Sequence, residues 1–154
     1  MSSAVKAGAR RHDGQTQVQA LADIAAGEVI LHLEGKVLKT PTRHSIRIGI
    51  DRHVDTAGTD PAVAANVFRF LNHSCEANAR VEGLELIAVR AISAGEQIMF
   101  DYDANEWDMT SPFQCGCGAA TCRGLIRGYR HLGQVEHQRI EHLVNPYLRG
   151  KQTH

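Results

Sequence analysis

The chain has 154 residues, of which 43% are hydrophobic and 22% are charged, and its mean hydropathy is -0.27. These values are typical of one soluble globular domain, and no apolar run approaches the ~20 residues that span a bilayer. The 17 basic and 17 acidic residues cancel, so neither membrane association nor direct nucleic-acid binding, which normally needs a basic excess, is expected.

Residues 1–13 are expected to form a flexible N-terminal tail. Lys6, Arg10 and Arg11 are basic, but no apolar segment follows them, so the tail does not read as a secretory signal. The protein is therefore expected in the cytoplasm, where a reducing environment makes stable disulfides rare.

Much of the chain from residue 16 to residue 102 is predicted to form short strands separated by turns. Residues 29–33 are a compact apolar run, residues 45–50 alternate with period two, and residues 79–89 resemble a hairpin. Residues 60–70 predict a short helix that begins with Asp60 as its cap. The pattern indicates a β-rich α+β domain.

One sequence pattern, Ile-x-Ala-Gly-Glu-x-Ile, occurs at residues 24–30 and again at residues 92–98. Each copy predicts a tight turn, in which glycine supplies an unusual backbone angle, followed by a strand. Two short matches do not make a repeat protein. They indicate two strand entries that are built alike.

The C-terminal residues 134–144 favour a helix that ends at Asn145-Pro146. Its histidines, His137 and His142, are not spaced four residues apart and are expected on a solvated face. A helical C-terminal extension is therefore predicted after the strand-rich region.

The four cysteines are the strongest chemical signal. Cys115, Cys117 and Cys122 lie in one glycine-rich segment whose small residues allow the backbone to wrap around a centre. Zinc prefers four ligands in a tetrahedron, and Cys75 is the one cysteine left to complete the set. One structural zinc ion is predicted. A redox pair, two disulfides and simple packing are the competing interpretations, and Cys-x-Cys is a poorer redox signature than Cys-x-x-Cys.

Three strings together resemble the SET-domain methyltransferases. They are Asn72-His73-Ser74-Cys75 followed by Asn78, the late Asp101-Tyr102, and the cysteine loop, which is similar to the post-SET segment of that family. The resemblance covers roughly residues 16–128. Each string alone is weak evidence, but the three occur in order and at suitable separations.

The resemblance implies a SET fold in which the segment 72–75 crosses the segment 100–102 in a knot-like arrangement. It divides the chain into a SET domain at residues 14–110, a post-SET zinc-binding segment at residues 111–128 and the helical extension at residues 129–154. S-adenosylmethionine would bind on one side, and a lysine side chain would enter a narrow channel from the other.

The resemblance also implies roles for individual residues. Tyr102 would be catalytic, and Phe100 and Trp107 would contact the substrate. The cofactor-binding residues would be Asn72, His73, Gln17 and Phe113. Phe113 could instead anchor the loop on the core. The acidic residues around Trp107 are Asp103, Glu106 and Asp108. They could form an acidic entrance for the cationic lysine, or they could simply belong to a solvated turn.

One departure from the family leaves two hypotheses open. The Gly-x-Gly string that approaches the cofactor is replaced by Gln15-Thr16-Gln17, where side chains would crowd the backbone. The first hypothesis is a methyltransferase that acts on a lysine of a protein or peptide. The second is a SET-like scaffold, either a binding module or an enzyme of a small metabolite. The sequence names neither the substrate nor the oligomeric state.

Overall fold

A computed structural model describes residues 6–56 and 58–149 of the chain. Its strands are β1 (Ala7–His12), β2 (Gln15–Ala20), β3 (Val29–His32), β4 (Lys36–Leu38), β5 (Ile46–Gly49), β6 (Arg52–Asp55), β7 (Asn72–His73), β8 (Ala79–Glu82), β9 (Glu85–Ala88), β10 (Met99–Phe100), β11 (Phe113–Gln114) and β12 (Leu125–Ile126). Its helices are α1 (Gln134–Arg139) and the 3-10 helices η1 (Ala64–Phe70), η2 (Tyr102–Ala104), η3 (Tyr129–His131), η4 (Glu141–Leu143) and η5 (Pro146–Leu148). None of these helices is long and apolar enough to cross a membrane.

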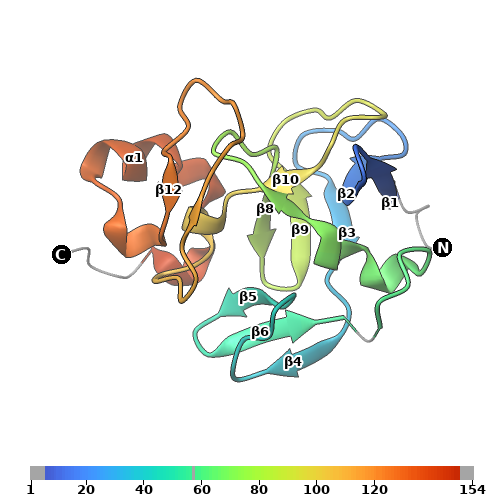
Figure 1. Ribbon diagram of the computed structural model, residues 1–154, viewed down its shortest axis with the longest axis horizontal. Coiled ribbons are helices and arrows are strands. Elements are labelled where there is room, and N and C mark those ends of the chain that lie inside the picture. Colours follow the sequence, from blue (N-terminus) through green and yellow to red (C-terminus); the bar gives the residue numbers. More distant parts are fainter. Residues whose placement is uncertain (1–5, 57, 150–154) are drawn as a thin grey trace.

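Several small sheets build the molecule (Figure 1). The central sheet has the strand order β3-β9-β8-β10-β7, and a second sheet has the order β4-β6-β5. The pairs β1-β2 and β11-β12 form separate two-stranded sheets. The β1-β2 pair and the C-terminal elements lie toward opposite ends of the molecule (Figure 1). The β-rich α+β class expected from the sequence is confirmed.

Strand β10 joins segments that lie far apart in the sequence. It is parallel to both of its neighbours, with Met99 opposite Asn72, and Phe100 opposite both His73 and Ala79. Asn78 secures this arrangement, because its side chain donates to the Gln97 carbonyl at 2.8 Å and accepts from the Met99 amide at 2.9 Å. The two segments expected to cross therefore lie side by side.

The two copies of the repeated pattern contact each other. Ile24 and Ile92 exchange both backbone hydrogen bonds, at 2.8 and 2.9 Å, in an isolated antiparallel bridge. Gly27 and Gly95 have φ values of 84° and 91°, a left-handed region that glycine adopts without strain. The similar strand entries predicted from the sequence are thus paired across the molecule, which the sequence pattern did not indicate.

Two apolar clusters stabilise the fold. The larger one unites side chains from the N-terminal hairpin, the second sheet, η1 and the central sheet, including Val18, Val54, Phe68 and Leu86. The smaller one is built mainly from residues after 128, among them Ile140 and Leu148, and partly buried Trp107 packs against it. Ala77 and Ala104 also belong to the smaller cluster, so the C-terminal residues pack against the strand-rich part of the chain.

The first part of the chain differs from expectation. Residues 7–12, expected within the flexible tail 1–13, form β1 and pair with β2 in an unbroken antiparallel register. The turn between them has positive φ at both Asp13 (51°) and Gly14 (80°). Asp-Gly favours this two-residue hairpin turn, whose backbone twist matches that of paired strands. The turn signal was present in the sequence, and the tail boundary falls inside the hairpin.

The predicted helices are shorter than expected. The Asp60 side chain accepts a hydrogen bond from the Ala62 amide at 3.0 Å, which makes a local turn, and η1 begins only at Ala64. The C-terminal helix α1 ends at Arg139, and a 3-10 helix follows it. Burial of Ile140 and Leu143 in the smaller cluster overrides the helical preference of this segment.

Candidate functional site

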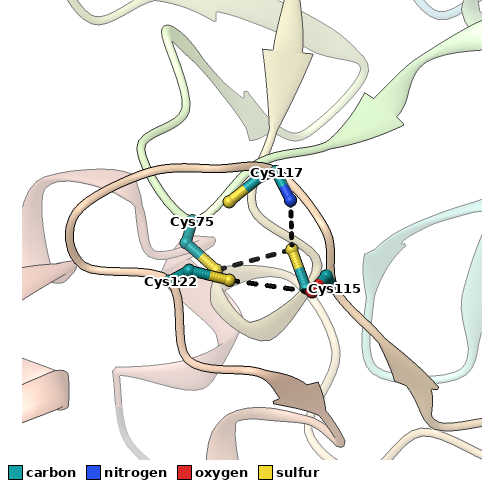
Figure 2. A group of neighbouring side chains, drawn as sticks. All are labelled: Cys75, Cys115, Cys117 and Cys122. Carbon is teal, nitrogen blue, oxygen red and sulfur yellow. Dashed lines mark hydrogen bonds between the residues drawn. The ribbon is translucent and has the colours of Figure 1, made fainter.

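The four cysteines converge as predicted (Figure 2). Their sulfur atoms all lie within 4.8 Å of one another, and the Cys75 and Cys115 sulfurs are 3.8 Å apart. In a tetrahedral site with Zn–S bonds of ~2.3 Å, neighbouring sulfurs are about 3.8 Å apart. All four ligand positions are supplied by thiols, so the site fits one closed, structural zinc ion.

Local backbone structure brings these sulfurs together. Strands β11 and β12 pair antiparallel and close the ends of the loop that carries Cys115, Cys117 and Cys122. Cys75 approaches from the segment after β7, and the Arg123 amide donates to its sulfur at 3.4 Å. Burial raises the pKa of the Cys75 thiol, so a bound metal must displace this proton.

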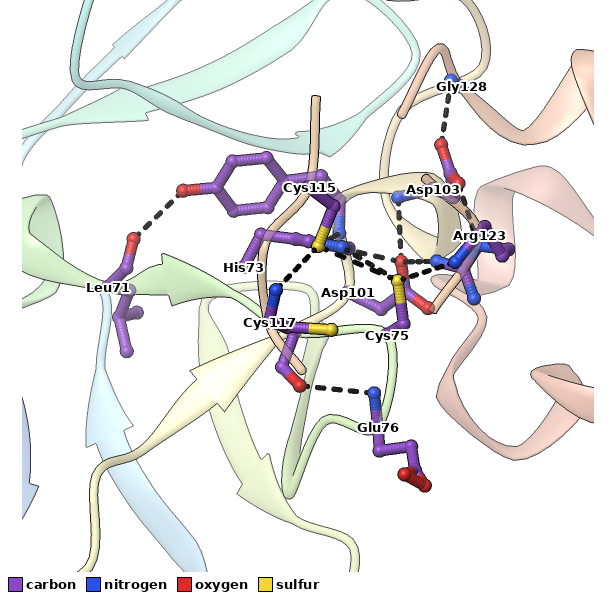
Figure 3. A network of polar contacts seen from close by, with 12 residues as sticks. Leu71, His73, Cys75, Glu76, Asp101, Asp103, Cys115, Cys117, Arg123 and Gly128 are labelled. Carbon is purple, nitrogen blue, oxygen red and sulfur yellow. Dashed lines mark hydrogen bonds and ion pairs between the residues drawn. The ribbon is translucent and has the colours of Figure 1, made fainter. Parts of the chain in front are cut away.

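Arg123 connects the cysteine loop to the Asp-Tyr segment (Figure 3). Its Nη2 lies 2.5 Å from Asp101 Oδ1, and its Nε lies 3.0 Å from Asp103 Oδ2. Asp103 also accepts from the Gly128 amide at 2.7 Å. Both carboxylates are fully buried, and their pairing with Arg123 compensates much of the cost of burying charge. Burial still raises the pKa of Asp101 to about 6, against the opposing charge of Arg123.

His73 lies between the cysteines and Tyr102. Its Nδ1 accepts from the Tyr102 amide at 3.0 Å, and its Nε2 lies 3.4 Å from the Cys75 sulfur. Burial, followed by the charge of Arg123, lowers the pKa of His73 to about 4. The ring is therefore neutral near pH 7. Because Nδ1 accepts, the ring proton sits on Nε2 and faces the sulfur.

Tyr102 is the centre of an aromatic group. Its ring lies 4.8 Å from that of Phe100, 5.2 Å from His73 and 5.7 Å from Phe113. Its hydroxyl donates to the Leu71 carbonyl at 3.0 Å. Burial raises the pKa of this hydroxyl to about 12, so Tyr102 stays neutral and can act as a hydrogen-bonding group but not as a base.

The structure brings together most of the residues singled out in the sequence. His73, Phe100, Tyr102 and Phe113 form one group, and Asn72 is exposed beside it on β7. Phe113 also packs edge-on against His73, at 5.7 Å. Its position suits both roles considered for it, as an anchor for the loop and as one wall of a cofactor site.

Two further expected site residues are not members of this aromatic group. Trp107 packs against the smaller cluster, with its ring 6.3 Å from that of Tyr129 and the Arg130 guanidinium 5.9 Å above it. Gln17 lies in the regular part of β2, opposite Arg10, and is half-buried. Their roles at the substrate and the cofactor stay predictions.

A groove of about 550 Å³ opens beside Tyr102. Its lining comes from the segment 41–47, the end of η1, and residues 105–111 except Trp107, together with Phe100 and Tyr102. Glu106 and Arg47, both in the lining, form an ion pair at 2.9 Å. Burial raises the pKa of Glu106, and Arg47 opposes that shift. The groove therefore gives a side chain from outside access to the Tyr102 ring.

Arg123 and Asn105 were not among the site residues expected from the sequence. Asp103 was expected among the acidic residues around Trp107, but it is fully buried and pairs with Arg123 instead. Asn105 accepts from Asn145 at 2.8 Å, and its carbonyl accepts from the Tyr147 hydroxyl at 2.6 Å, which ties the C-terminal extension to the groove. An arginine directly after Cys122 and an aspartate directly after Tyr102 were visible. Only the folded geometry shows that they pair.

Parallel pairing of an Asn-His-Ser-Cys segment with an Asp-Tyr segment, next to a cysteine loop that reaches back to the first, defines a SET-type fold. Residues 16–103 match the SET domain family, and the chain belongs to that family. It is 28% identical over 125 residues to "Histone-lysine N-methyltransferase, H3 lysine-36 specific" of Chaetomium globosum, covering 70% of this chain and 14% of that protein.

Other relatives agree with this placement. "Methyltransferase flvH" of Aspergillus flavus is 32% identical over 91 residues, which are 54% of this chain and 50% of that protein. The solved structure of KRYPTONITE in complex with mCHG DNA and SAH superimposes with a TM-score of 0.56 at 25% identity, covering 75% of this chain and 27% of that one. The chain thus spans at most half the length of these relatives.

Proposed function

We propose that the protein is a methyltransferase that transfers the methyl group of S-adenosylmethionine to a lysine amine of a protein or peptide. The observation that carries the proposal is the position of Tyr102, which lines the groove on one side and contacts His73 and Phe113 on the other. The family relatives, which include histone-lysine N-methyltransferases, and a neighbour solved with SAH support it.

S-adenosylmethionine, when bound, supplies a methyl group on a positively charged sulfur. Asn72, with its exposed side chain beside the aromatic group, would hold the amino-acid part of the cofactor. The backbone of His73 and the ring of Phe113, which meet at 5.7 Å, would hold the adenine. Phe100 would line the lysine channel, since it borders both the groove and Tyr102.

Tyr102 would position the amine rather than deprotonate it. Its hydroxyl is held by the Leu71 carbonyl, which leaves its oxygen lone pairs free to accept from an amine. Lysine has an ordinary pKa near ~10.4 and must lose a proton before it attacks. A channel that removes water disfavours the ammonium form. Alignment of the attacking nitrogen is then the main contribution of the protein.

The zinc ion would be structural. Arg123 follows Cys122 and binds the two aspartates on either side of Tyr102. A metal that fixes the cysteine loop would therefore also fix Arg123 and Phe113, and through them the aromatic group. It would take no part in methyl transfer.

A SET-like scaffold without lysine methylation is the second candidate. It is favoured by one observation, that glutamines rather than glycines occupy positions 15 and 17 of β2. Their side chains add bulk to the strand expected to border the cofactor.

Calorimetric titration with S-adenosylmethionine and a methyl-transfer assay on peptides and lysates, read by mass spectrometry, test the proposal. We expect binding and lysine methylation, and Tyr102→Phe should lower kcat about 100-fold because the amine is no longer oriented. Tyr129→Phe, in the smaller cluster, is the matched control and should retain activity. No heat and no thermal shift with millimolar cofactor would favour the second candidate.

A further inference from the structure

One wall of the groove carries positive charge that the described neighbours do not neutralise. Arg43, His44 and Arg69 line it, and neither arginine forms an ion pair with any residue that the structure describes. Arg69 donates to the Gly58 carbonyl at 3.0 Å, and its guanidinium lies 5.7 Å from the centre of the Phe70 ring. Its position is therefore fixed while its charge stays available.

The charges of the same two arginines also affect the pKa of His44. Partial burial, followed by the charges of Arg69 and Arg43, lowers it, and Asp55 opposes the shift. The two guanidinium groups thus act together on one point of the wall. His44 itself is neutral near pH 7, so the arginines supply the charge.

The two carboxylates in the groove lining already have partners. Glu106 pairs with Arg47 at 2.9 Å, and Asp108 lies 2.8 Å from His131 Nε2 and 3.5 Å from Arg130. Neither forms an ion pair with Arg43 or Arg69 among the described residues. The groove therefore combines unpaired guanidinium groups with carboxylates that are already paired.

We propose that this groove selects a polypeptide segment in which acidic residues flank the target lysine, with their carboxylates against Arg43 and Arg69. The inference rests on the proposed function, because it takes Tyr102 as the point that the lysine reaches. Guanidinium groups bind carboxylates through paired hydrogen bonds. A nucleic acid fits less well, since its binding normally needs a basic excess and the chain has no net charge.

The test uses the full chain and short peptides with one central lysine, flanked by glutamate, glutamine or arginine and otherwise identical. We expect kcat/KM for the glutamate peptide to exceed that for the glutamine peptide about fivefold, as two exposed ion pairs permit. The difference should shrink as salt is added. Equal values, or a preference for the arginine peptide, would overturn the inference while leaving the proposed function intact.

Substitutions of single arginines test which residues cause the preference for the acidic peptide. Arg43→Glu should reverse the ranking in favour of the arginine peptide. Arg139→Glu replaces an exposed arginine of α1 outside the groove lining and should leave the ranking unchanged. A ranking that Arg43→Glu does not alter would contradict the proposed contact.

Fluorescence anisotropy of the same labelled peptides separates this inference from the proposed function. If no peptide is methylated, the methyltransferase proposal fails, and binding decides the inference alone. Tighter binding of the glutamate peptide that Arg43→Glu abolishes supports it, and equal binding overturns it. Displacement of the glutamate peptide by duplex DNA at a similar concentration would also overturn it, because the wall would then be a phosphate site.

Discussion

His53 shows how a single titratable side chain links this fold to pH. It lies in β6, opposite Leu38 of β4 and Arg47 of β5, and is only 2% exposed. Burial, followed by the charge of Arg47, lowers its pKa below 6.5, and Asp51 opposes the shift. The folded protein thus takes up this proton at a lower pH than the unfolded chain does.

This shift predicts a loss of stability in mild acid. Well above pH 6.5 His53 is neutral in both the folded and the unfolded state. As the pH is lowered, the unfolded chain binds the proton first, so the free energy of unfolding decreases as the pH decreases. In His53→Gln the fall between pH 6.5 and pH 5 should be shallower, as measured by urea unfolding. Exposed His32→Gln is the control, and an unchanged slope in His53→Gln would contradict the assignment.

At the level of single residues, the candidate site was only partly predictable from the sequence. Cys75, Tyr102 and His73 stand in strings whose chemistry is local, so their type and spacing were informative. Arg123 was not predictable, because its role depends on two buried carboxylates that lie 20 and 22 positions away. Trp107 was placed beside the substrate on its acidic neighbours, but packing against Tyr129 holds it in the smaller cluster.

Among the elements, the sheet β4-β6-β5 depends on one close approach. Gly35, just before β4, lies so near the end of β6 that an added Cβ would be 1.8 Å from the Asp55 carbonyl oxygen. No side-chain movement relieves that clash, because the obstacle is backbone. The sheet also supports the segment 41–47, which lines the groove.

Gly35→Ala should therefore destabilise the protein by about 2–3 kcal/mol or more, as overpacking does. Thermal and urea unfolding measure the effect. Gly116→Ala is the matched control, since an added Cβ there meets nothing within 4 Å, and it should change stability by less than about 0.5 kcal/mol. Equal stability of the two variants would show that β4 and β6 can separate without cost.

Most elements with a local cause could be predicted from the sequence, whereas a pairing between distant segments could not. The hairpin around Gly83 (φ 57°) was expected and is present. The Asp13-Gly14 turn was equally local but was read as part of a tail. The bridge between Ile24 and Ile92 depends on pairing across the molecule, so no pattern within either copy could indicate it.

For the whole molecule, the zinc site connects parts of the chain that are 40 positions apart. Cys117→Ser should lower the zinc content measured by mass spectrometry and reduce thermal stability. Affinity for S-adenosylmethionine should fall with it, because Phe113 and Arg123 flank the same loop. Ser93→Ala, outside this region, is the control. Purified protein with no zinc and four freely reactive thiols would contradict the site.

The position of β10 also bears on when the metal site can close. It fills a place between β7 and β8, two strands that precede it and are joined by the short segment containing Cys75. The three later cysteines follow β10 in the chain, so we expect the metal site to close late in folding, after β10 has docked beside β7. Zinc should then slow unfolding more than it accelerates folding, which unfolding and refolding rates with and without zinc would measure.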